Sequence, residues 1–321
     1  MGVFVFLPLV LPLTAWPVAR LAEQRLDPRT ATRLLAVLAG VSAVCSTLCL
    51  GLLVIVGTAQ LPGNPLPDGW SDPDVRAAVP YDEVAGRAAI PALLAVLVSC
   101  GGAAWRQLRA RRRAAGALGG LPTTSVAVLP DRTPYAYALP GGDSTRRGRT
   151  GGRRGRVVVS TGMLAGLSSA ERRALFAHER AHLAGHHHRH LLTVHLAARA
   201  NPFLRPLRTA VAYTAERWAD EEAAAEVGSR RTVARAIGRA ALLAPGAPAA
   251  TLPAVAGAGP VPRRVAALMR PAPVGGAWPP VFTAVGLAAW GAAFGVTVSA
   301  LSSANSAVTL FLVLHATAAP V

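Results

Sequence analysis

Long apolar stretches constrain the fold of this chain more than any other feature of its sequence. A helix needs about 20 mostly apolar residues to cross the hydrocarbon core of a bilayer. Four segments approach that length, at residues 1–19, 34–57, 88–105 and 277–300. A fifth segment, 301–321, is uncharged but carries polar residues, which leaves open whether it crosses, re-enters or lies at the surface. The sequence therefore predicts an α-helical membrane protein with four or five transmembrane helices.

The charged residues between the apolar stretches set the expected orientation. Arginines, the only basic residues of the chain apart from histidine, are concentrated in 20–33 and 106–113, whereas 58–87 is mainly acidic. Short cytoplasmic segments of membrane proteins are enriched in basic residues. We therefore expect the N-terminus outside, segments 20–33 and 106–276 in the cytoplasm, and the chain as a multi-pass protein of the cell membrane, with the lipid bilayer as a partner.

The net charge of +17 would ordinarily suggest nucleic acid as a partner. Here the arginines lie beside apolar spans and in one glycine-rich loop, 140–155, and aromatic residues make up only 5% of the chain. No aromatic pattern for base stacking is interleaved with the arginines. We therefore expect no nucleic-acid binding. The cysteines lie inside apolar stretches and form no C-x-x-C pair, which excludes a cysteine metal site of that kind.

Residues 114–276 form the only portion long enough to fold outside the membrane, between a transmembrane region at 1–113 and another at 277–321. Three short strands are predicted, at 125–129, 135–139 and 156–160. Four helices are predicted, from Ser168 or Ser169 to about Gly185 or beyond, and at 206–227, 230–243 and 263–269. His186 to His190 are expected to continue along the first of these helices or to cover its end. The expected domain is mainly α-helical and carries a small β-sheet.

The first helix of this domain contains His178-Glu179-Arg180-Ala181-His182, which matches the pattern H-E-x-x-H. Residues i and i+4 share one helix face, so both imidazoles can reach one ion. Zinc binds imidazole nitrogen readily, and its catalytic sites keep one position open for water. Glu179 can then take a proton from that water. A solvated His/Arg helix face is the alternative, and the position of the pattern after a strand favours the zinc site.

Two residues compete for the position of third ligand. His188 completes the extended pattern H-E-x-x-H-x-x-G-x-x-H, but a run of three histidines makes that match easy to obtain, and the pattern also requires a downstream methionine turn. Glu216 lies on the next long predicted helix, with Asp220 one turn later. One of these carboxylates can bind the ion while the other hydrogen-bonds a ligand imidazole. This arrangement favours Glu216, and His188 remains the alternative.

With these residues in view, the chain resembles integral-membrane zinc peptidases of the BlaR/MecR type and the related HtpX/Ste type. The resemblance covers about 122–270, and its segments are 157–164, 167–168, 177–183 and 216–225, of which the last fits the BlaR/MecR type better. It implies a zincin-like (α+β) peptidase domain that faces the cytoplasm and binds Zn²⁺. It implies that His178, His182 and Glu216 are the zinc ligands and that Glu179 is the general base. It also implies that Asp220 contacts a ligand rather than the metal itself.

The resemblance also suggests where a substrate binds. The strand that contains Tyr137 resembles the one that lines the cleft, where a peptide adds as a further strand. A basic residue of a later helix is expected to help hold the oxyanion, and only Arg263 or Arg264 can do so here. The known antibiotic sensors carry an extracellular penicillin-binding domain after their last span. This sequence has none, so direct β-lactam sensing is not expected.

The expected function is that of a zinc endopeptidase whose substrate is a cytoplasmic or membrane-proximal protein or peptide, such as a transcriptional repressor cleaved in signalling. An HtpX-like protease for quality control of membrane proteins uses the same chemistry and is the first alternative. A non-enzymatic membrane scaffold with a vestigial metal site is the second.

Overall fold

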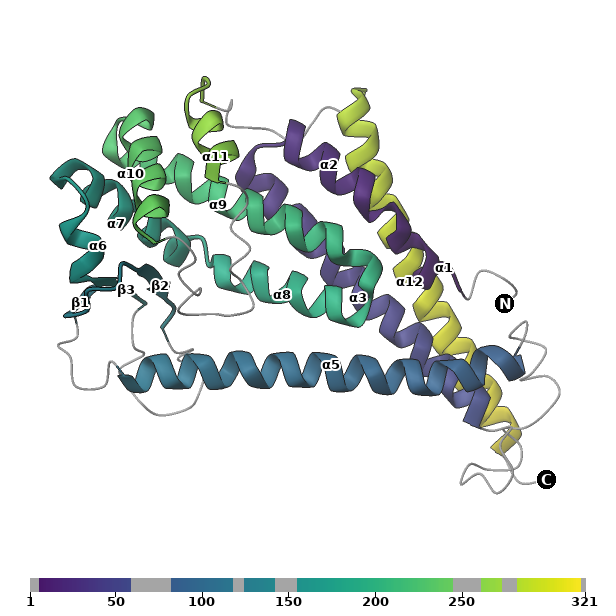
Figure 1. The fold of residues 1–321 in the computed structure, drawn as a ribbon. Coiled ribbons are helices and arrows are strands. Elements are labelled where there is room, and N and C mark those ends of the chain that lie inside the picture. The colour runs from purple at the N-terminus through teal and green to yellow at the C-terminus, as the bar shows by residue number, and fades with distance from the viewer. Residues whose placement is uncertain are drawn as a thin grey trace.

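Figure 1 shows a computed structural model of the chain, which describes residues 6–58, 82–117, 124–141, 155–244, 261–272 and 282–318. Most of the predicted external segment 58–87 and most of the loop 140–155 lie outside the described residues. The N-terminal elements are α1 (Leu7–Val10), the 3-10 turn η2 (Leu11–Thr14), α2 (Ala15–Arg25), α3 (Pro28–Thr58) and α5 (Asp82–Ala117). The strands are β1 (Val126–Leu129), β2 (Ala136–Leu139) and β3 (Arg156–Ser160). The later elements are α6 (Thr161–Ala165), α7 (Ser169–Ala184), α8 (His187–Ala200), η4 (Pro202–Leu204), α9 (Arg205–Val227), α10 (Arg230–Leu243), α11 (Val261–Leu268) and α12 (Ala284–Ala318).

Two of the described helices are long and apolar enough to cross a membrane, Pro28–Ile55 in α3 and Val84–Ala114 in α5. They contain the predicted spans 34–57, apart from its last two residues, and 88–105. In the most apolar window of each, 44% of the α3 residues but only 11% of the α5 residues are buried by the rest of the chain. Helix α5 thus presents most of its apolar surface outward, as a helix in contact with lipid does.

The described part of the apolar stretch 1–19, from residue 6 on, is interrupted by its prolines and does not form one regular helix. Pro12 has no N–H, so the carbonyl of Pro8, four residues earlier, has no helical donor. The Ser46 hydroxyl of α3 donates to that carbonyl at 2.7 Å, and the Asn201 side-chain amide donates to the Ser46 oxygen at 3.0 Å. A polar side chain of a neighbouring helix thus satisfies the freed carbonyl, as apolar surroundings require.

Replacing Ser46 with Ala should lower the free energy of unfolding by about 1–3 kcal/mol, because the Pro8 carbonyl then has no donor in a buried position. Thr47→Ala is the matched control, since the Thr47 hydroxyl donates at 2.8 Å to the Ala43 carbonyl of its own helix. We expect that control to cost about 0.5 kcal/mol or less. Denaturant titrations of both variants in one detergent measure the difference, and equal losses would show that the Ser46 bridge adds no stability.

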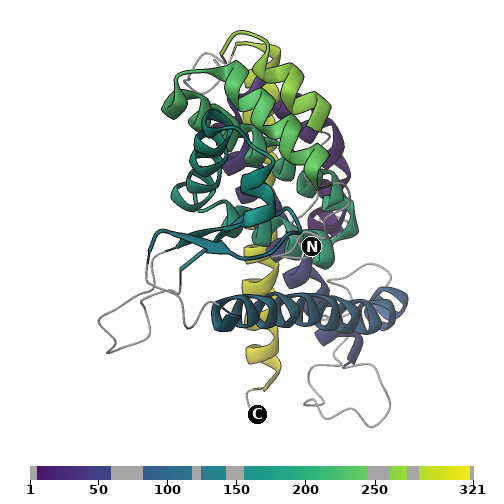
Figure 2. The same cartoon turned by 60° about the vertical axis from the view of Figure 1, so that its left-hand side comes forward.

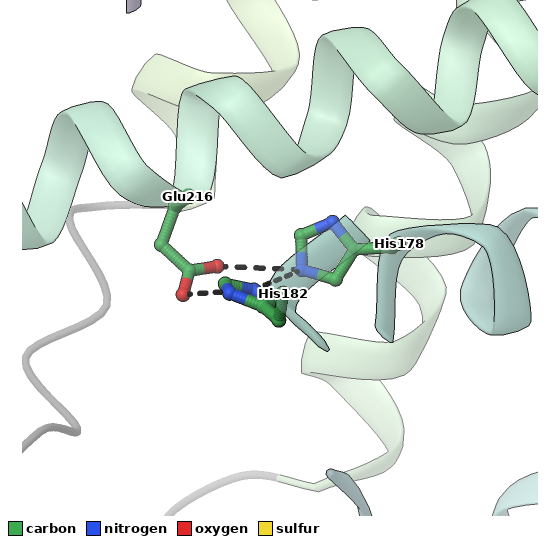
Figure 3. A group of neighbouring side chains, drawn as sticks. All are labelled: His178, His182 and Glu216. Carbon is green, nitrogen blue, oxygen red and sulfur yellow. Dashed lines mark hydrogen bonds and ion pairs between the residues drawn. The ribbon is translucent and has the colours of Figure 1, made fainter. Parts of the chain in front are cut away.

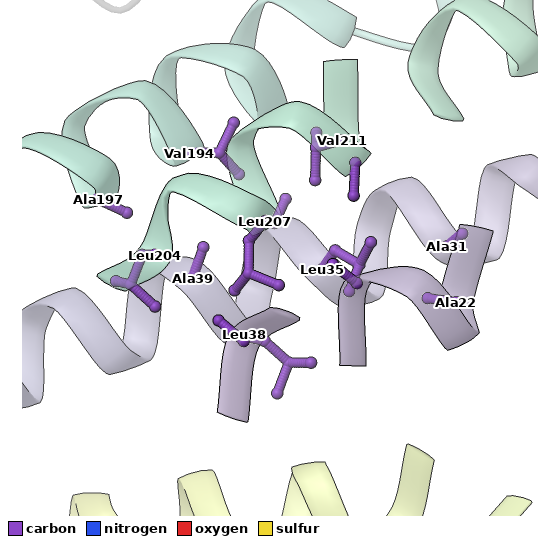
Figure 4. Packing of buried hydrophobic residues seen from close by; sticks show 14 of the residues in the cluster. Ala22, Ala31, Leu35, Leu38, Ala39, Val194, Ala197, Leu204, Leu207 and Val211 are labelled. Carbon is purple, nitrogen blue, oxygen red and sulfur yellow. The ribbon is translucent and has the colours of Figure 1, made fainter. Parts of the chain in front are cut away.

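Helix α3 packs against α8 and α9 through an apolar core that also includes α2 (Figure 4). Leu35 and Leu38 of α3 lie in this core with Val194 of α8 and Val211 of α9. A buried hydrogen bond between the hydroxyls of Thr32 and Thr214, at 2.9 Å, joins α3 to α9 in the same region. A long apolar helix of the predicted region 1–113 therefore shares a core with two helices of the predicted region 114–276.

The C-terminal region contains one long helix among its described residues. The predicted segments 277–300 and 301–321 both contribute to α12, which continues without a break from Ala284 to Ala318. Ala292 and Val296 pack against the core that α3 shares with α8 and α9. Figure 1 shows α12, in yellow, running beside α1 and α3.

The three strands form one sheet in the order β1-β3-β2, in which β3 pairs in parallel with β1 and antiparallel with β2. The three valines of β3 are buried, as expected for a central strand. Strand β2 lies at an edge, and the Ser160 N–H donates to the Tyr135 carbonyl at 3.0 Å. Because hydrogen-bonded pairs alternate along an antiparallel ladder, the N–H and C=O groups of Ala136 and Ala138 face the open side. In Figure 2 the sheet lies between α5 and the helices α6, α7 and α10.

Helix α7, which carries the H-E-x-x-H residues, begins as predicted and ends sharply. The Ser168 hydroxyl accepts from the Glu171 N–H, and the Glu171 carboxylate accepts from the Ser168 N–H at 2.8 Å, which is a capping box. The helix ends at Ala184, and His186 takes a left-handed conformation with φ 49°. The prediction that His186 to His190 continue along α7 is wrong, because a second helix, α8, begins at His187, whereas the alternative that they cover its end holds for His187, whose ring lies against Gly185 and His182.

Candidate metal centre

Helix α7 brings the two imidazoles of the H-E-x-x-H pattern together. Because they lie one turn apart on one face, the Nε2 atoms of His178 and His182 are 3.1 Å from each other. Both side chains are largely buried, with exposed fractions of 10% and 14%. Two nitrogen donors therefore point to one place between α7 and α9.

Helix α9 supplies a carboxylate at the same place. Glu216 lies with one oxygen 3.5 Å from Nε2 of His178 and the other 3.4 Å from Nε2 of His182 (Figure 3). Ligand atoms of the three side chains all lie within 4.8 Å of one another. The alternative third ligand, His188, is not brought into this group, and its ring lies against that of His186 with 6.1 Å between centroids.

A donor set of two imidazole nitrogens and one carboxylate fits a catalytic zinc ion, which uses three protein ligands and leaves a position open. Burial opposes the charging of His178, but Asp220 and Glu216 outweigh it and raise the pKa of that imidazole to about 10. Burial lowers the pKa of His182 to about 4. Since a metal binds neutral imidazole, we expect binding to release the proton held at His178.

Asp220 and Arg264 contact the possible ligands from outside the cluster. One oxygen of Asp220, a fully buried side chain, is 3.1 Å from Nδ1 of His178, within ion-pair range although the angle is outside hydrogen-bond geometry. Arg264 of α11 donates to both oxygens of Asp220, at 2.9 and 2.6 Å, and its third nitrogen is 2.8 Å from Glu216. Burial opposes ionisation of Glu216, but Arg264 and His182 hold the pKa of its carboxyl well below the ordinary value.

The other residues expected near a substrate lie elsewhere or have other contacts. Arg263 points away to Glu23 of α2 at 2.7 Å, and its guanidinium lies over the Tyr213 ring. Tyr137 stacks on Tyr135, with 6.2 Å between ring centroids, and packs against the small core of the sheet. Arg264 is the residue of this set that the structure brings to the site, where it contacts carboxylates.

Glu179 is buried beside the three possible ligands and close to strand β2. Burial raises the pKa of the Glu179 carboxyl to about 7, with a further increase from Glu216, while His178, Arg264 and the Ala138 backbone N–H lower it. A carboxyl group whose pKa is near the working pH is well suited to accept and return a proton. The contact with Ala138 also places this carboxyl at the open edge of the sheet.

Sequence reasoning missed the pairing of Arg264 with the two carboxylates, although the sequence contains a signal for it. Val261, Val265 and Leu268 mark the apolar face of α11, and Arg264 lies on that same face. An arginine on a buried face requires an anionic partner. No comparable signal identifies His187, which the break between α7 and α8 brings against His182, with 2.8 Å between their Nδ1 atoms.

Comparison with protein families finds one match, to peptidase family M48, over residues 103–200. The matched region includes the sheet, α7 and α8, and ends before Glu216. Searches of curated proteins and of solved structures find no match. The family match supports a metallopeptidase, and the cluster of His178, His182 and Glu216 is a possible metal site in it.

Proposed function

We propose that this chain is a membrane-embedded zinc endopeptidase with Glu179 as its general base. The observation that carries the proposal is the meeting of His178 and His182 of α7 with Glu216 of α9. The residue after His178 is Glu179, whose buried carboxyl can accept a proton beside this cluster. The match to peptidase family M48 supports the same reaction class.

The residues divide the work of peptide hydrolysis between them. When bound, zinc would supply Lewis acidity, which lowers the pKa of water toward neutrality. Glu179 accepts the proton of the attacking water and then delivers it to the leaving amine. Asp220 holds Nδ1 of His178 so that Nε2 stays directed inward, and Arg264 fixes both Asp220 and Glu216. The tight pairing of Arg264 with these carboxylates supports a role in holding the ligands rather than the oxyanion.

The substrate chain is proposed to add to the open edge of β2. The backbone groups of Ala136 and Ala138 face away from β3, and the Ala138 N–H contacts the Glu179 carboxyl. An extended peptide that pairs with this edge would therefore pass next to the proton acceptor. Tyr137, on the same strand, is proposed to contact substrate side chains.

We place the peptidase region, 114–276, on the cytoplasmic side of the cell membrane. The arginine-rich segments 20–33 and 106–113 lead to that side by the rule for basic residues. The ion pair between Glu23 and Arg263 supports this placement, because it joins the first of these segments to α11 of the peptidase region. The BlaR/MecR-type arrangement of spans remains part of the proposal.

A cytoplasmic or membrane-proximal protein is the proposed substrate, such as a transcriptional repressor. Trapping in native membranes with the full-length Glu179→Gln variant tests this assignment. One dominant trapped partner would support signalling, whereas many unrelated membrane proteins would support quality control of the HtpX type instead.

Metal binding provides the first test of the site. We expect one zinc per purified wild-type chain, loss of proteolysis in liposomes on chelation, and recovery when zinc is returned. Glu216→Gln should weaken zinc binding strongly. The loss should exceed the roughly 10- to 100-fold loss in metal affinity that is typical when a residue that hydrogen-bonds a metal ligand, without contacting the metal, is substituted. Glu226→Gln, on the same helix but paired with the exposed Arg180, is the control and should bind normally. A wild-type chain without bound metal would favour the scaffold alternative.

A further inference from the structure

The turn between α7 and α8 brings together two histidines that a continuous helix would separate. His187 follows His182 by five residues, so on one helix their side chains would point about 140° apart. The left-handed conformation of His186 breaks the helix between them. As a result His187 folds back, and its Nδ1 lies 2.8 Å from Nδ1 of His182, with the two rings nearly perpendicular at 89°.

His182 thus has a partner at each of its nitrogens. Its Nε2 faces His178 and Glu216, and its Nδ1 faces His187. His178 likewise uses Nε2 toward the cluster, and its Nδ1 faces the carboxylate of Asp220. The Nδ1 atoms of the two candidate ligands therefore have different partners. That of His178 faces a carboxylate, and that of His182 faces an imidazole.

We propose that His187 is a positioning residue for the metal site, whose Nδ1 accepts a hydrogen bond from the Nδ1–H of His182. Two nitrogens at this distance share a single proton. If His182 uses the Nε2 lone pair for an ion, that proton belongs to its own Nδ1, and His187 must be the acceptor. The contact thereby selects the tautomer of His182 that can bind metal, and it fixes the plane of the ring. The inference rests on the proposed zinc site.

The surroundings of His187 hold it in this orientation. Its side chain is 1% exposed, and its ring packs against that of Trp218 with 4.4 Å between centroids. A Cβ at Gly185 would lie 2.4 Å from Nε2 of His187, so the ring fits only because residue 185 has no side chain. Trp218 is two residues after Glu216 on α9, so the helix that presents the carboxylate also supports the imidazole behind His182.

Nε2 of His187 is buried and has no hydrogen-bond partner among the described residues. The proposed proton arrangement puts a hydrogen on this atom, since Nδ1 is the acceptor. Leaving that N–H unpaired costs free energy. The protein retains this cost while Nδ1 contacts His182, which is consistent with a role in the site rather than in stability.

The test uses two substitutions of similar shape that differ in the acceptor. His187→Leu removes it, and His187→Asn keeps a side-chain oxygen close to the place of Nδ1. We measure zinc affinity of the full-length chain in detergent by competition with a chromophoric chelator, and the visible spectrum of the Co²⁺-loaded protein. The Leu variant should bind zinc about 10- to 100-fold more weakly and show an altered Co²⁺ spectrum. The Asn variant should recover most of the affinity and the wild-type spectrum.

His190→Leu is the control, because His190 is on the same helix and near the same tryptophan, at 6.4 Å between centroids. Its affinity and spectrum should match the wild type. If metal-free His187→Leu protein does not melt cooperatively, His187→Phe, which keeps a ring against Trp218, replaces it. Equal affinities for the Leu and Asn variants would overturn the inference, as would a second bound metal that depends on His187. A wild-type chain that binds no zinc would instead refute the proposed site itself.

Discussion

Glu179→Gln should reduce the rate of proteolysis by a factor of about 10²–10⁴ while zinc binding stays at the wild-type level. Glutamine keeps the volume of the side chain but cannot accept a proton from water. Glu179 is not one of the three clustered ligand residues, so the ion should remain. Peptide cleavage in liposomes, with zinc measured on the same samples, separates loss of the base from loss of the metal.

Arg180→Gln is a matched control for this experiment, because Arg180 is the next residue of α7 and its side chain is 48% exposed. It should leave the rate nearly unchanged. Burial raises the pKa of Glu179 to about 7, so activity should fall as the pH drops and the base becomes protonated. A bound cation lowers this pKa, which places the acid limb of the profile at or below that value. Full activity of Glu179→Gln would refute the proposed mechanism.

Arg264→Leu should destabilise the metal-free protein by about 3–5 kcal/mol, the usual cost of leaving buried charges without their partner. The substitution strands the carboxylates of Asp220, which is fully buried, and of Glu216. Zinc would restore a positive charge next to Glu216, so the substitution should lower the stability of the zinc-loaded protein by less than that of the metal-free protein. Unfolding of both forms in detergent, by denaturant or by heat, measures the two losses.

Arg263→Leu provides the comparison, since Arg263 is the adjacent residue and its side chain is 42% exposed, whereas that of Arg264 is 6% exposed. It should cost about 1 kcal/mol or less. Arg264 also holds the pKa of Glu216 below its ordinary value, so its contribution is fully present above the pKa of an unfolded carboxyl and is lost as the pH falls through the depressed value. The difference between wild type and Arg264→Leu should therefore shrink in acid. Equal losses for the two arginine variants would contradict a buried network.

Local sequence signals were sufficient for the elements that carry the site. Ser168 and Glu171 marked the beginning of α7, Gly228 marked the end of α9, and the strands lie within a residue of their predicted positions. Each of these signals acts over a few residues, through a cap, a turn or an alternation of apolar side chains. The spacing of His178 and His182 depends on one helix turn in the same way.

The features that sequence reasoning missed depend on contacts between distant residues or on unusual backbone. A glycine next to a helix end ordinarily takes the left-handed conformation, but here Gly185 stays right-handed and His186 takes it. The sequence therefore gave no reason to separate His187 from the preceding helix. The central position of β3 and the packing of α3 on α8 and α9 likewise depend on the whole chain.

The apolar core that α3 shares with α8 and α9 has a practical consequence for any study of catalysis. A truncated chain of residues 114–276 would expose Val194, Leu207 and Val211, which pack in one core with α3. Such a fragment would be prone to aggregate. Of the two helices that carry the cluster of His178, His182 and Glu216, α9 packs on α3, which is long and apolar enough to cross a membrane. A change in the tilt of α3 would therefore be transmitted through α9 to Glu216.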